Sequence, residues 1–387
     1  MQTVSVAIIG GGLSGLYAAY LLEKKGVDYV LLEARPTLGG RIVTARATDP
    51  NTAQITDSTS GFDLGPSWFW PEYQQQLARL IDELQLESFA QFEEGDMLVE
   101  RSPNEPAMRT HGYKSAPPSM RLKGGMATLI DALYQRLDAT RILTNQKVRQ
   151  LHNTGHYIEI TSEDESGQVA VYQTQQWQAQ HVLLALPPRL AEESITFEPA
   201  LPTNLMTQWR GTATWMAPHA KYLAVYDNPF WQQQGLSGSA RSGQGPMVEI
   251  HDASVVDGNG ALFGFIGVPA AARQTVSADV LKQHCREQLV RLFGAQAESP
   301  QAEYLKDWAQ EPFTATSADA NSDGQHATAP ISKALSGIWA NSLSGIGSEW
   351  SAQFPGYLAG AIDAASIGVK NLPESIAQSV QNKSATL

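Results

Sequence analysis

The sequence contains a single cysteine, Cys285, among 387 residues. One thiol cannot form an intramolecular disulfide, nor a zinc or iron–sulfur site that is held by several thiolates. No apolar stretch reaches the about 18 residues that a membrane-spanning helix needs. No basic segment followed by an apolar one, as in a signal peptide, precedes the first expected strand. We therefore expect a protein of a reducing compartment, the cytoplasm.

Charged residues are also scarce, at 17% of the chain against roughly 25% in an average soluble protein. The 27 Lys and Arg residues and the 39 Asp and Glu residues give a net charge of −12. This charge would repel nucleic acids and anionic membrane surfaces, but not cationic small molecules. Hydrophobic residues make up 42% of the chain, which excludes a disordered protein and, at roughly 150 residues per domain, predicts two to three domains.

The chain begins with a pattern of strand, glycine-rich turn and helix. Residues 4–9 form a short apolar run typical of a buried strand, and residues 16–26 form an amphipathic helix. Between them, Gly10, Gly12 and Gly15 match the G-x-G-x-x-G motif. In this motif the first glycine makes a tight turn, the second lets a pyrophosphate approach the backbone, and the third lets helix and strand pack closely.

The helix start and the next strand complete a dinucleotide-binding pattern. The free N–H groups around Ser14 would face the phosphates, as at other helix N-termini. A second apolar strand over residues 29–32 ends in Glu33, at the spacing where an acidic residue accepts hydrogen bonds from the adenosine ribose. Both NAD and FAD use this unit, so the pattern alone leaves the cofactor open.

The residues that follow resemble the flavin-containing amine oxidase superfamily, which includes monoamine and polyamine oxidases, L-amino-acid oxidases and protoporphyrinogen oxidase. Glu33, Ala34 and Arg35 are followed by Gly39, Gly40 and Arg41, in the order E-A-R-x-x-x-G-G-R. The resemblance implies FAD as the cofactor. It also implies that the Gly-Gly-Arg loop wraps the pyrophosphate and that Arg41 reaches the flavin side.

Further matches follow in the same order as in the family. They are Asp63-Leu64-Gly65-Pro66-Ser67-Trp68 for D-x-G-x-x-W, Leu122 to Leu129 for G-G-M-x-x-L, Val182 to Pro188, Pro229-Phe230-Trp231, Trp308, and the segment from Pro355 to Ile362 for P-G-Y-x-x-G-A. The resemblance implies further contacts to FAD from Gly65, Pro66, Ser67, Trp68, Val148, Pro187 and Tyr357.

The resemblance also implies an α/β fold in which a Rossmann-type FAD-binding domain, of the second glutathione-reductase type, carries an inserted α+β substrate domain. The expected FAD-binding domain comprises residues 1–71, 116–190 and 332–387, and the substrate domain residues 72–115 and 191–331. Periodicity and turn residues add helices over 71–86, 126–137 and 280–293, a strand over 157–160 and an exposed loop over 314–330.

The chain departs from the family where the chemistry takes place. Amine-oxidising members commonly place a lysine near flavin N5, in the segment after Phe230 and Trp231, and residues 235–254 contain none. Arg241 is the only permanent cation there, so we name it as a candidate catalytic residue. The alternative is an ordinary arginine of an exposed loop. His251 nearby is expected to be structural.

Two further family features are incomplete. Monoamine oxidases frame the substrate between two aromatic rings; Tyr357 matches one, whereas the other position falls near Ala318. Phe313 or Trp350 could fill it, although both suit a core. The family's Ala-Gly-Glu motif is altered over residues 339–344, where Asn341 is the candidate contact to a phosphate.

The sequence favours an FAD-dependent oxidoreductase that oxidises an amine by hydride transfer to flavin N5. The expected partners are a small cationic amine and dioxygen or a quinone as electron acceptor. A homodimer could complete a pocket that the short first substrate-domain segment leaves open. Two alternatives stay open: a flavin desaturase or isomerase acting on a non-amine, and a non-catalytic FAD-containing maturation partner.

No metal site and no covalent flavin are expected. His152 and His156 are separated by a turn sequence rather than placed on one helix face. Cys285 lies inside an expected helix, far in sequence from every flavin motif, so FAD should be held non-covalently.

Overall fold

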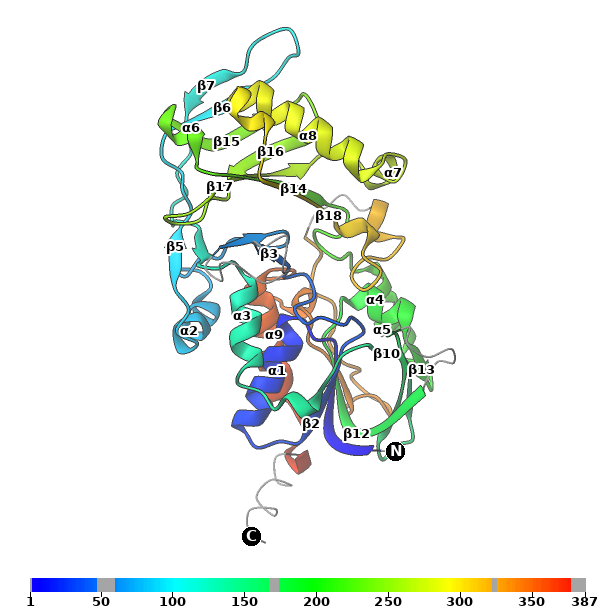
Figure 1. Ribbon diagram of the computed structural model, residues 1–387. Helices are drawn as coiled ribbons and strands as arrows, with labels where there is room; N and C mark the ends of the chain where they lie inside the picture. The colour runs from blue at the N-terminus through cyan, green and yellow to red at the C-terminus, as the bar shows by residue number, and fades with distance from the viewer. Residues whose placement is uncertain (1, 47–59, 167–173, 322–325, 377–387) are drawn as a thin grey trace. The chain divides into compact units, whose positions relative to one another are not determined.

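The computed structural model describes residues 2–46, 60–166, 174–321 and 326–376 (Figure 1). The chain divides into two compact units, each built from separate segments. Unit 1 contains Met1–Arg41, Ile130–Trp215 and Pro312–Leu387, and unit 2 contains Ile42–Leu129 and Met216–Glu311.

A largely parallel sheet forms the core of unit 1. Strand β1 (Gln2–Ile9) lies between β12 (Thr174–Leu184) and β2 (Tyr29–Leu32), and all three are parallel. The remaining strands are β9 (Ile142–Leu143) beside β2, β11 (Ile158–Asp164) and β19 (Leu343–Gly345) on β12, then β10 (Gln146–Asn153) and β13 (Thr196–Glu198). Apolar runs such as residues 6–9 are buried throughout, as expected for strands covered on both faces.

Helices α1 (Leu13–Lys24) and α9 (Leu358–Lys370) pack side by side in unit 1, where Figure 1 shows them in blue and red. Gly360 of α9 lets the helix approach the segment before it, since a Cβ there would lie 2.0 Å from the Phe354 carbonyl oxygen. Helices α4 (Pro188–Ser194) and α5 (Thr203–Gly211) also contact each other. From α5, Trp209 meets Trp350 edge-on at 5.3 Å between ring centroids, inside the main core of the unit.

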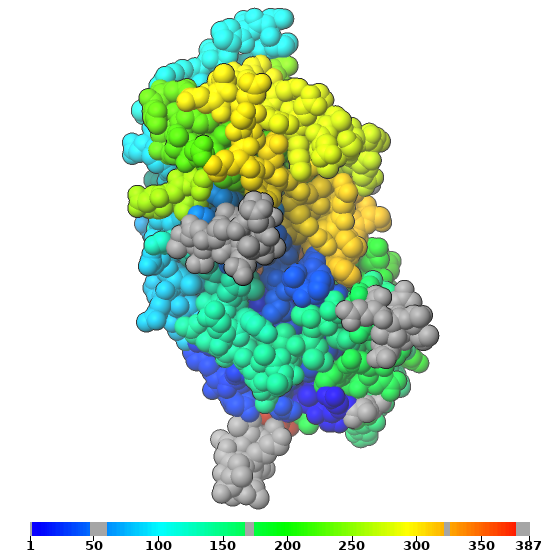
Figure 2. Space-filling view, viewed as in Figure 1, coloured from blue at the N-terminus to red at the C-terminus, as the bar shows by residue number. Residues whose placement is uncertain are grey.

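Unit 2 is built on a seven-stranded sheet with one long helix. The strands run in the order β18 (Ala302–Asp307), β14 (Ala220–Tyr226), β17 (Gly260–Ile266), β16 (Met247–Asp252), β15 (Leu236–Ser242), β6 (Asp96–Glu100) and β7 (Met108–His111). Helix α8 (Ala278–Phe293) packs on one face of this sheet (Figure 1). Its outer side is open to solvent, as the yellow surface in Figure 2 shows.

Residues alternate between the two faces of the unit 2 sheet. On β14, Tyr222, Ala224 and Tyr226 pack beneath α8, whereas Leu223 and Val225 belong to a second core on the opposite face. Unit 2 also contains two short strand pairs, β3 (Thr44–Arg46) with β4 (Gly61–Asp63) and β5 (Ser88–Ala90) with β8 (Met120–Leu122). Its other helices are α2 (Gln75–Glu83), α6 (Phe230–Gln233) and α7 (Ala270–Arg273).

Most of the expected elements are confirmed. The strand over 29–32 is β2, the helix over 280–293 is α8, and the helix over 126–137 is α3 (Ala127–Tyr134). The expected helix over 71–86 is shorter, because residues 71–73 form a turn and α2 begins at Gln75. The fold class, α/β with a Rossmann-type domain, is confirmed as well.

The expected loop over 314–330 is wrong in its first part, because Thr314, Thr316 and Asp319 are buried. The Asp319 carboxylate accepts hydrogen bonds from the backbone N–H groups of Thr214 and Thr316 and pairs with Arg189 at 2.6 Å. This polar segment can therefore be buried, because both oxygens of the Asp319 carboxylate accept hydrogen bonds.

The two units also divide the chain at positions other than those expected. Residues 42–71 and 116–129 group with unit 2, because β3 pairs with β4 and Asp63 accepts the backbone N–H of Met126 at 2.8 Å. Residues 191–215 and 312–331 group with unit 1. Residues 191–215 belong to unit 1 because Trp209 of α5 packs on Trp350 in its core.

Candidate active site

The glycine turn of unit 1 has the geometry that its sequence predicts. Gly10 has φ +109°, and its N–H donates to the Leu32 carbonyl at 2.8 Å. A Cβ on Gly15 would lie 2.0 Å from the Gly10 carbonyl oxygen, so only glycine permits this approach of helix and strand. By contrast, a Cβ on Gly12 would meet nothing closer than 3.8 Å. The side of Gly12 is therefore open, as a ligand phosphate requires.

The start of α1 offers unpaired donors beside this opening. Gly12 is the N-cap residue of α1 and supplies no side chain to cap it, so no capping side chain satisfies the first-turn N–H groups that include that of Ser14. The Gly-Gly-Arg loop lies against the same turn, because the N–H of Gly39 donates to the Gly11 carbonyl at 2.9 Å. Gly40 follows with φ +61°. The two glycine-rich segments thus lie against each other beside the uncapped start of α1, an arrangement that suits an anion.

Glu33 ends β2 with its side chain buried. One carboxylate oxygen accepts the N–H of Gly11 at 2.6 Å, and the other accepts the N–H of Arg35 at 2.8 Å. Each oxygen keeps a further lone pair for another donor. The carboxylate is therefore held in place by the backbone, beside the predicted ribose site, with acceptor capacity to spare.

Residues around Arg35 form the neighbouring wall. The Arg35 guanidinium donates to Thr314 Oγ1 at 3.0 Å and lies 5.6 Å from the ring of Phe313. The amine of Lys147 lies 5.1 Å from the same ring. Beyond Lys147, the buried Val148 sits on β10, which begins where the N–H of Gln146 donates to the Glu33 carbonyl. Phe313 thus belongs to the Glu33 end of the site, which speaks against its predicted role as a second ring beside Tyr357.

Arg41 pairs with an acidic residue that the sequence motifs do not single out. Its guanidinium makes two hydrogen bonds to the carboxylate of Glu349, at 2.5 and 3.0 Å, and a third to Ser348 Oγ at 3.0 Å. Burial opposes the positive charge, but the Glu349 carboxylate outweighs it and raises the pKa of Arg41. Such a bidentate pair fixes the guanidinium in one orientation.

Glu349 lies outside residues 339–344, where the sequence analysis places the family's altered Ala-Gly-Glu motif. Strand β19 is Leu343–Gly345 and runs parallel to β12, so Glu349 follows the carboxyl end of the strand. Asn341 precedes β19 and is exposed at the opposite edge of the sheet, where its carbonyl lies 3.0 Å from Nδ1 of His181. The predicted cofactor role of Asn341 is therefore not supported. The sequence places the altered Ala-Gly-Glu motif at residues 339–344, where β19 begins, whereas Glu349 follows the end of that strand.

The carboxyl end of β12 completes this part of the site. The N–H of Ala185 donates to the Ile9 carbonyl at 2.8 Å, and the buried Pro187 follows before α4 begins. A Cβ on Gly10 would lie 2.8 Å from the Ala185 carbonyl oxygen. The segment that leads to Pro187 is thus in contact with the glycine turn.

Tyr357 is the N-cap residue of α9 and lies among other aromatic rings of unit 1. Its ring stacks on His326, with centroids 4.7 Å apart and planes 17° apart, and lies 4.8 Å from the ring of Trp215. Trp350, the other candidate for a ring beside Tyr357, is buried in the core on Trp209 instead. Trp215 and His326 are therefore the rings that accompany Tyr357.

Unit 2 contains a separate group of predicted site residues around β4 and β14. Asp63 ends β4, and the following segment leads through Gly65 and Pro66 to the buried Ser67 and to Trp68. The amine of Lys221, on β14, donates to Ser67 Oγ at 2.8 Å and to the Gly65 carbonyl at 3.3 Å. It also lies 3.8 Å from the centroid of the Phe263 ring.

Lys221 is a buried amine with unusual electrostatics. Only 3% of the residue is exposed, and no carboxylate among the described residues lies within ion-pair distance of it. Burial lowers the pKa of Lys221 to about 7. The charge of Asp63 opposes this shift and the charge of Arg121 adds to it. A lysine of this kind exchanges a proton near neutral pH, which few lysines do.

Lys221 was missed from the sequence because the family pattern directs attention to the residues after Phe230 and Trp231. The lysine lies before them, in the strand A-K-Y-L-A-V-Y. It shares a sheet face with Leu223 and Val225, which are buried. A lysine in phase with the apolar residues of a buried strand was the available signal.

The described residues fit a dinucleotide at the glycine turn. The open side of Gly12, the uncapped start of α1 and the remaining acceptor capacity of Glu33 match the pyrophosphate and ribose of such a ligand. Comparison with known proteins identifies the ligand class. Residues 107–368 match the family model described as flavin containing amine oxidoreductase, and residues 8–84 match that of an NAD(P)-binding Rossmann-like domain. The chain belongs to the flavin-containing amine oxidoreductase family.

Individual relatives resemble the chain over nearly its whole length. A probable flavin-containing monoamine oxidase A from Dictyostelium discoideum is 22% identical, over 93% of this chain and 95% of its own. The structure of a putrescine oxidase bound to putrescine superimposes with a TM-score of 0.73 at 20% identity, covering 95% of this chain and 98% of its own. Cyclohexylamine oxidase from Brevibacterium oxydans IH-35A gives a TM-score of 0.74 at 19% identity, covering 98% and 99%.

Arg241 does not occupy a buried site in this flavin-family chain. It lies on β15 with 64% of its side chain exposed and pairs with Glu249 at 3.2 Å. Glu249 also lies 2.9 Å from Nε2 of His251, whose ring meets Trp68 at 4.9 Å between centroids. This exposed, paired position does not support a catalytic role for Arg241. The side chain that contacts the D-x-G-x-x-W segment is the buried amine of Lys221.

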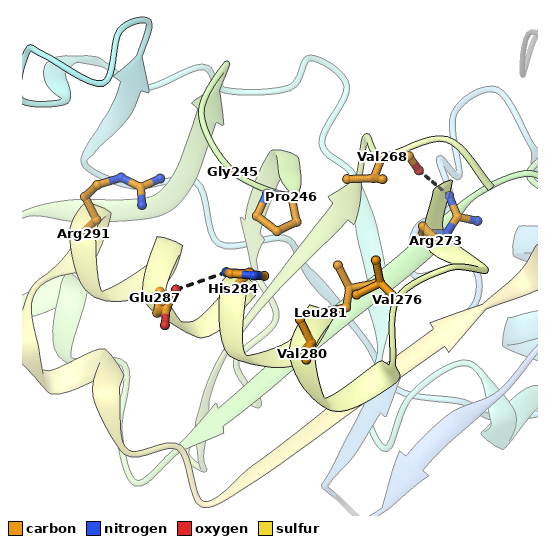
Figure 3. Close-up of a pocket in the computed structure, with 10 residues that line it drawn as sticks. All are labelled: Gly245, Pro246, Val268, Arg273, Val276, Val280, Leu281, His284, Glu287 and Arg291. Carbon is orange, nitrogen blue, oxygen red and sulfur yellow. Dashed lines mark hydrogen bonds and ion pairs between the residues drawn. The ribbon is translucent and has the colours of Figure 1, made fainter. Parts of the chain in front are cut away.

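A groove of about 420 Å³ lies elsewhere in unit 2, between α8 and the turn at Gly245 and Pro246 (Figure 3). Its other lining residues are Val268, Arg273, Val276, Val280, Leu281, His284, Glu287 and Arg291. None of them belongs to a flavin motif. Both arginines are paired, Arg273 with Asp307 and Arg291 with Glu100. The two arginines therefore present no uncompensated charge to a ligand, and the other ionisable lining residues, His284 and Glu287, contact each other at 3.2 Å.

Two predicted absences concern only the described parts of the chain. In these parts, no group of three or more His, Cys, Asp or Glu residues could hold a metal ion. No helix found there has both the length and the apolar character that crossing a bilayer would require. His152 and His156 flank a turn in which Asn153 Oδ1 accepts the N–H of Gly155.

Replacing Glu33 tests the predicted ribose site. Glu33→Ala should weaken FAD binding about tenfold or more, because charge-assisted hydrogen bonds are worth roughly 1.5–3 kcal/mol each. Titration of apoprotein with FAD, followed by flavin fluorescence, measures the dissociation constant. Glu33→Gln, which keeps the size and one acceptor for the backbone, should lie between Ala and wild type. An unchanged constant in both variants would show that the ribose is not bound there.

The pKa of Lys221 predicts a pH-dependent stability. Between about pH 7 and pH 10.5 the unfolded lysine binds a proton that the folded one has lost, so folding is favoured increasingly as the pH rises. Lys221→Met removes this dependence. Its stability relative to wild type should therefore fall by about 3 to 5 kcal/mol between pH 7 and pH 10.5, since a tenfold change in the proton-binding constant corresponds to about 1.4 kcal/mol.

Urea unfolding of both proteins at several pH values measures this difference. Lys370→Met, at an exposed lysine of α9, is the control for losing one lysine. A constant difference between Lys221→Met and wild type across this range would contradict the assignment.

Proposed function

We propose that the chain is an FAD-dependent amine oxidase that acts on a small cationic amine. The observation that carries the proposal is Lys221, a buried amine that is hydrogen-bonded to Gly65 and Ser67 of the D-x-G-x-x-W segment in a chain of this family. The family resemblance places that segment beside the flavin. When bound, FAD supplies the acceptor for the hydride that leaves the amine carbon.

Unit 1 would hold the cofactor through fixed backbone groups. The N–H groups at the start of α1 bind the pyrophosphate, Glu33 accepts the ribose hydroxyls, and Arg41 is kept in one orientation by Glu349. Arg35, Gly40, Ala34 and Val148 line the same end of the sheet. Since these groups are preorganised by bonds within the protein, binding would require little rearrangement.

Lys221 would accept the proton of the substrate ammonium group. Only a neutral amine releases hydride, whereas the acidic chain attracts the cation. A base with a pKa close to the working pH is the most effective proton acceptor. Lys221 has a pKa of about 7 and keeps two neutral hydrogen-bond partners that hold its amine in place.

Tyr357 would supply an aromatic wall for the substrate, together with Trp215 and His326. A ring face attracts a cation or amine by roughly 0.5–2 kcal/mol. A flavin desaturase or isomerase is an alternative because residues 235–254 lack a lysine and one position of the aromatic pair is unfilled. Lys221 answers the first reason, and the rings of Trp215 and His326 beside Tyr357 answer the second, so amine oxidation is the preferred proposal. On the sequence alone, we infer a cytoplasmic location and dioxygen or a quinone as acceptor.

Anaerobic mixing of the yellow protein with a panel of primary amines and diamines tests the function. At least one amine should bleach the flavin, and Tyr357→Ala should slow the bleaching at least several-fold while FAD content stays near wild type. Tyr113→Ala, at a tyrosine that is 75% exposed, is the control. Failure of every amine to bleach the flavin, with bleaching by an alkene or porphyrinogen precursor instead, would favour the desaturase.

The flavin should be released by acid. Cys285, the only cysteine, is buried in α8, and burial raises the pKa of its thiol to about 12, so it is not poised to form a thioether. Trichloroacetic acid precipitation should leave all the flavin in the supernatant, for wild type and for Cys285→Ala alike. Yellow colour in the wild-type pellet would contradict non-covalent binding.

A further inference from the structure

Four neighbouring strands of unit 2, namely β14, β17, β16 and β15, carry a row of side chains that leads away from Lys221 (Figure 1). In register, Phe265 of β17 lies between Lys221 of β14 and Glu249 of β16. Arg241 of β15 lies opposite Glu249 in turn. Since neighbouring strands are about 4.8 Å apart, the backbone positions of Lys221 and Arg241 are separated by roughly 14 Å. The row therefore begins at a buried amine and ends at an ion pair.

The side chains of this row share the sheet face opposite α8. Ala240 of β15 and Ile250 of β16 pack beneath α8. Because side chains alternate along a strand, Arg241 and Glu249 lie on the other face. That face also carries Phe263, which belongs to the second core of the unit.

Direct contacts connect the two ends of the row. The amine of Lys221 lies 3.8 Å from the centroid of the Phe263 ring, which lies 5.3 Å from the ring of His251. Nε2 of His251 lies 2.9 Å from Oε1 of Glu249. The Arg241 guanidinium makes hydrogen bonds of 3.2 and 3.3 Å to the same carboxylate. Exposure increases along this path, from the buried Lys221 to the side chains of His251, at 21%, and Arg241, at 64%.

Aromatic rings cover the face between the two ends. Phe265 lies 5.4 Å from Phe263, and Trp68 lies 5.5 Å from Phe263 and 4.9 Å from His251, all between ring centroids. Trp68 and Phe265 are only partly buried. Such rings suit the apolar body of an amine whose reacting end lies at Lys221.

The charges at the outer end of the row are already compensated. Glu249 is its one carboxylate, and Arg241 and His251 both contact it. On the other side of Lys221, Lys306 of β18 pairs with Glu311 at 2.7 Å. A second ammonium group at the outer end would find no unpaired carboxylate in this row, and would lose water without compensation.

We propose that Arg241, by pairing with Glu249, restricts the substrate to amines with one cationic end and an apolar body, and excludes diamines. Without Arg241, the Glu249 carboxylate would be available to the far ammonium of a diamine. Without Glu249, the guanidinium would repel that ammonium. Arg241 is thus a specificity-determining residue that takes no part in the reaction. The inference rests on the proposed function, because it takes the reacting end of the amine to lie at Lys221.

The test compares amines that have the same carbon chain and differ only at the far end. Butylamine is paired with putrescine, and octylamine with the corresponding diamine. Anaerobic flavin reduction gives kcat/KM for each, and hence a diamine-to-monoamine ratio. In the wild type, the diamine of each pair should be poorer by about tenfold or more. A wild type that prefers the diamines would contradict the proposal.

Arg241→Gln should raise the ratio about tenfold or more, while kcat/KM for butylamine stays within about twofold of wild type. The change should appear mainly in KM, because the far charge affects binding rather than hydride transfer. Glu249→Gln should lower the ratio, since it leaves Arg241 unpaired. A variant with both substitutions has lost both charges and should return close to wild type.

Arg109→Gln is the matched control, because it removes an exposed arginine that is paired with Asp96 at 2.7 Å, outside the row. Its ratio should equal that of the wild type. An unmoved ratio in Arg241→Gln would overturn the proposal. Shifts in the same direction in Arg241→Gln and Glu249→Gln would do so too, because a merely structural ion pair predicts that result.

The outcomes separate this inference from the proposed function. If amines reduce the flavin but the ratio ignores these charges, only this inference fails. If no amine reduces the flavin in any variant, the proposed function fails. Calorimetric titration of oxidised holoenzyme with butylamine and putrescine then still measures whether binding follows the charges, and binding that does not follow them would overturn the inference.

Discussion

Three strands of unit 1 end at the same level, and the site depends on this alignment. Ile9 of β1, Leu184 of β12 and Gly345 of β19 lie next to one another in register. The chain leaves all three in close contact, with the Ala185 N–H on the Ile9 carbonyl and the Ile346 N–H on the Leu184 carbonyl. Segments from the beginning, middle and end of the sequence are thereby brought together, and only residues without a side chain fit at the tightest points.

Local sequence was sufficient to predict the glycine turn and the strands on either side of it. The glycine spacing, the apolar strands and Glu33 each specify their own conformation, since turn, helix start and buried strand all have local signals. The Arg41–Glu349 pair could not be predicted in this way, because its residues are 308 positions apart. The expectation for Asn341 has another origin, because a three-residue strand such as β19 carries too little pattern to be located in the sequence.

The catalytic side of the prediction failed for a different physical reason. A permanent cation, Arg241, attracted attention as a candidate, yet on an exposed strand it is neutralised by the neighbouring Glu249. Lys221 resembles any other lysine in the sequence, and only its enclosure in the fold lowers its pKa. By contrast, the buried Asp319 has a direct ionic partner in Arg189. The absence of such a partner at Lys221 is the property that a sequence cannot express.

The order of segments along the chain has a consequence for synthesis. Unit 2 contains no residue after Glu311, whereas unit 1 is built from both the first 41 residues and Pro312–Leu387, with Ile130–Trp215 between them. During translation the strand β1 is made long before β12 and β19, its partners in the aligned ends. Unit 2 can therefore fold on the ribosome while the glycine turn still lacks its neighbouring segments, and unit 1 is completed last. No contiguous fragment of this gene would yield unit 1 alone, and separate expression would require joining its three segments in a redesigned chain.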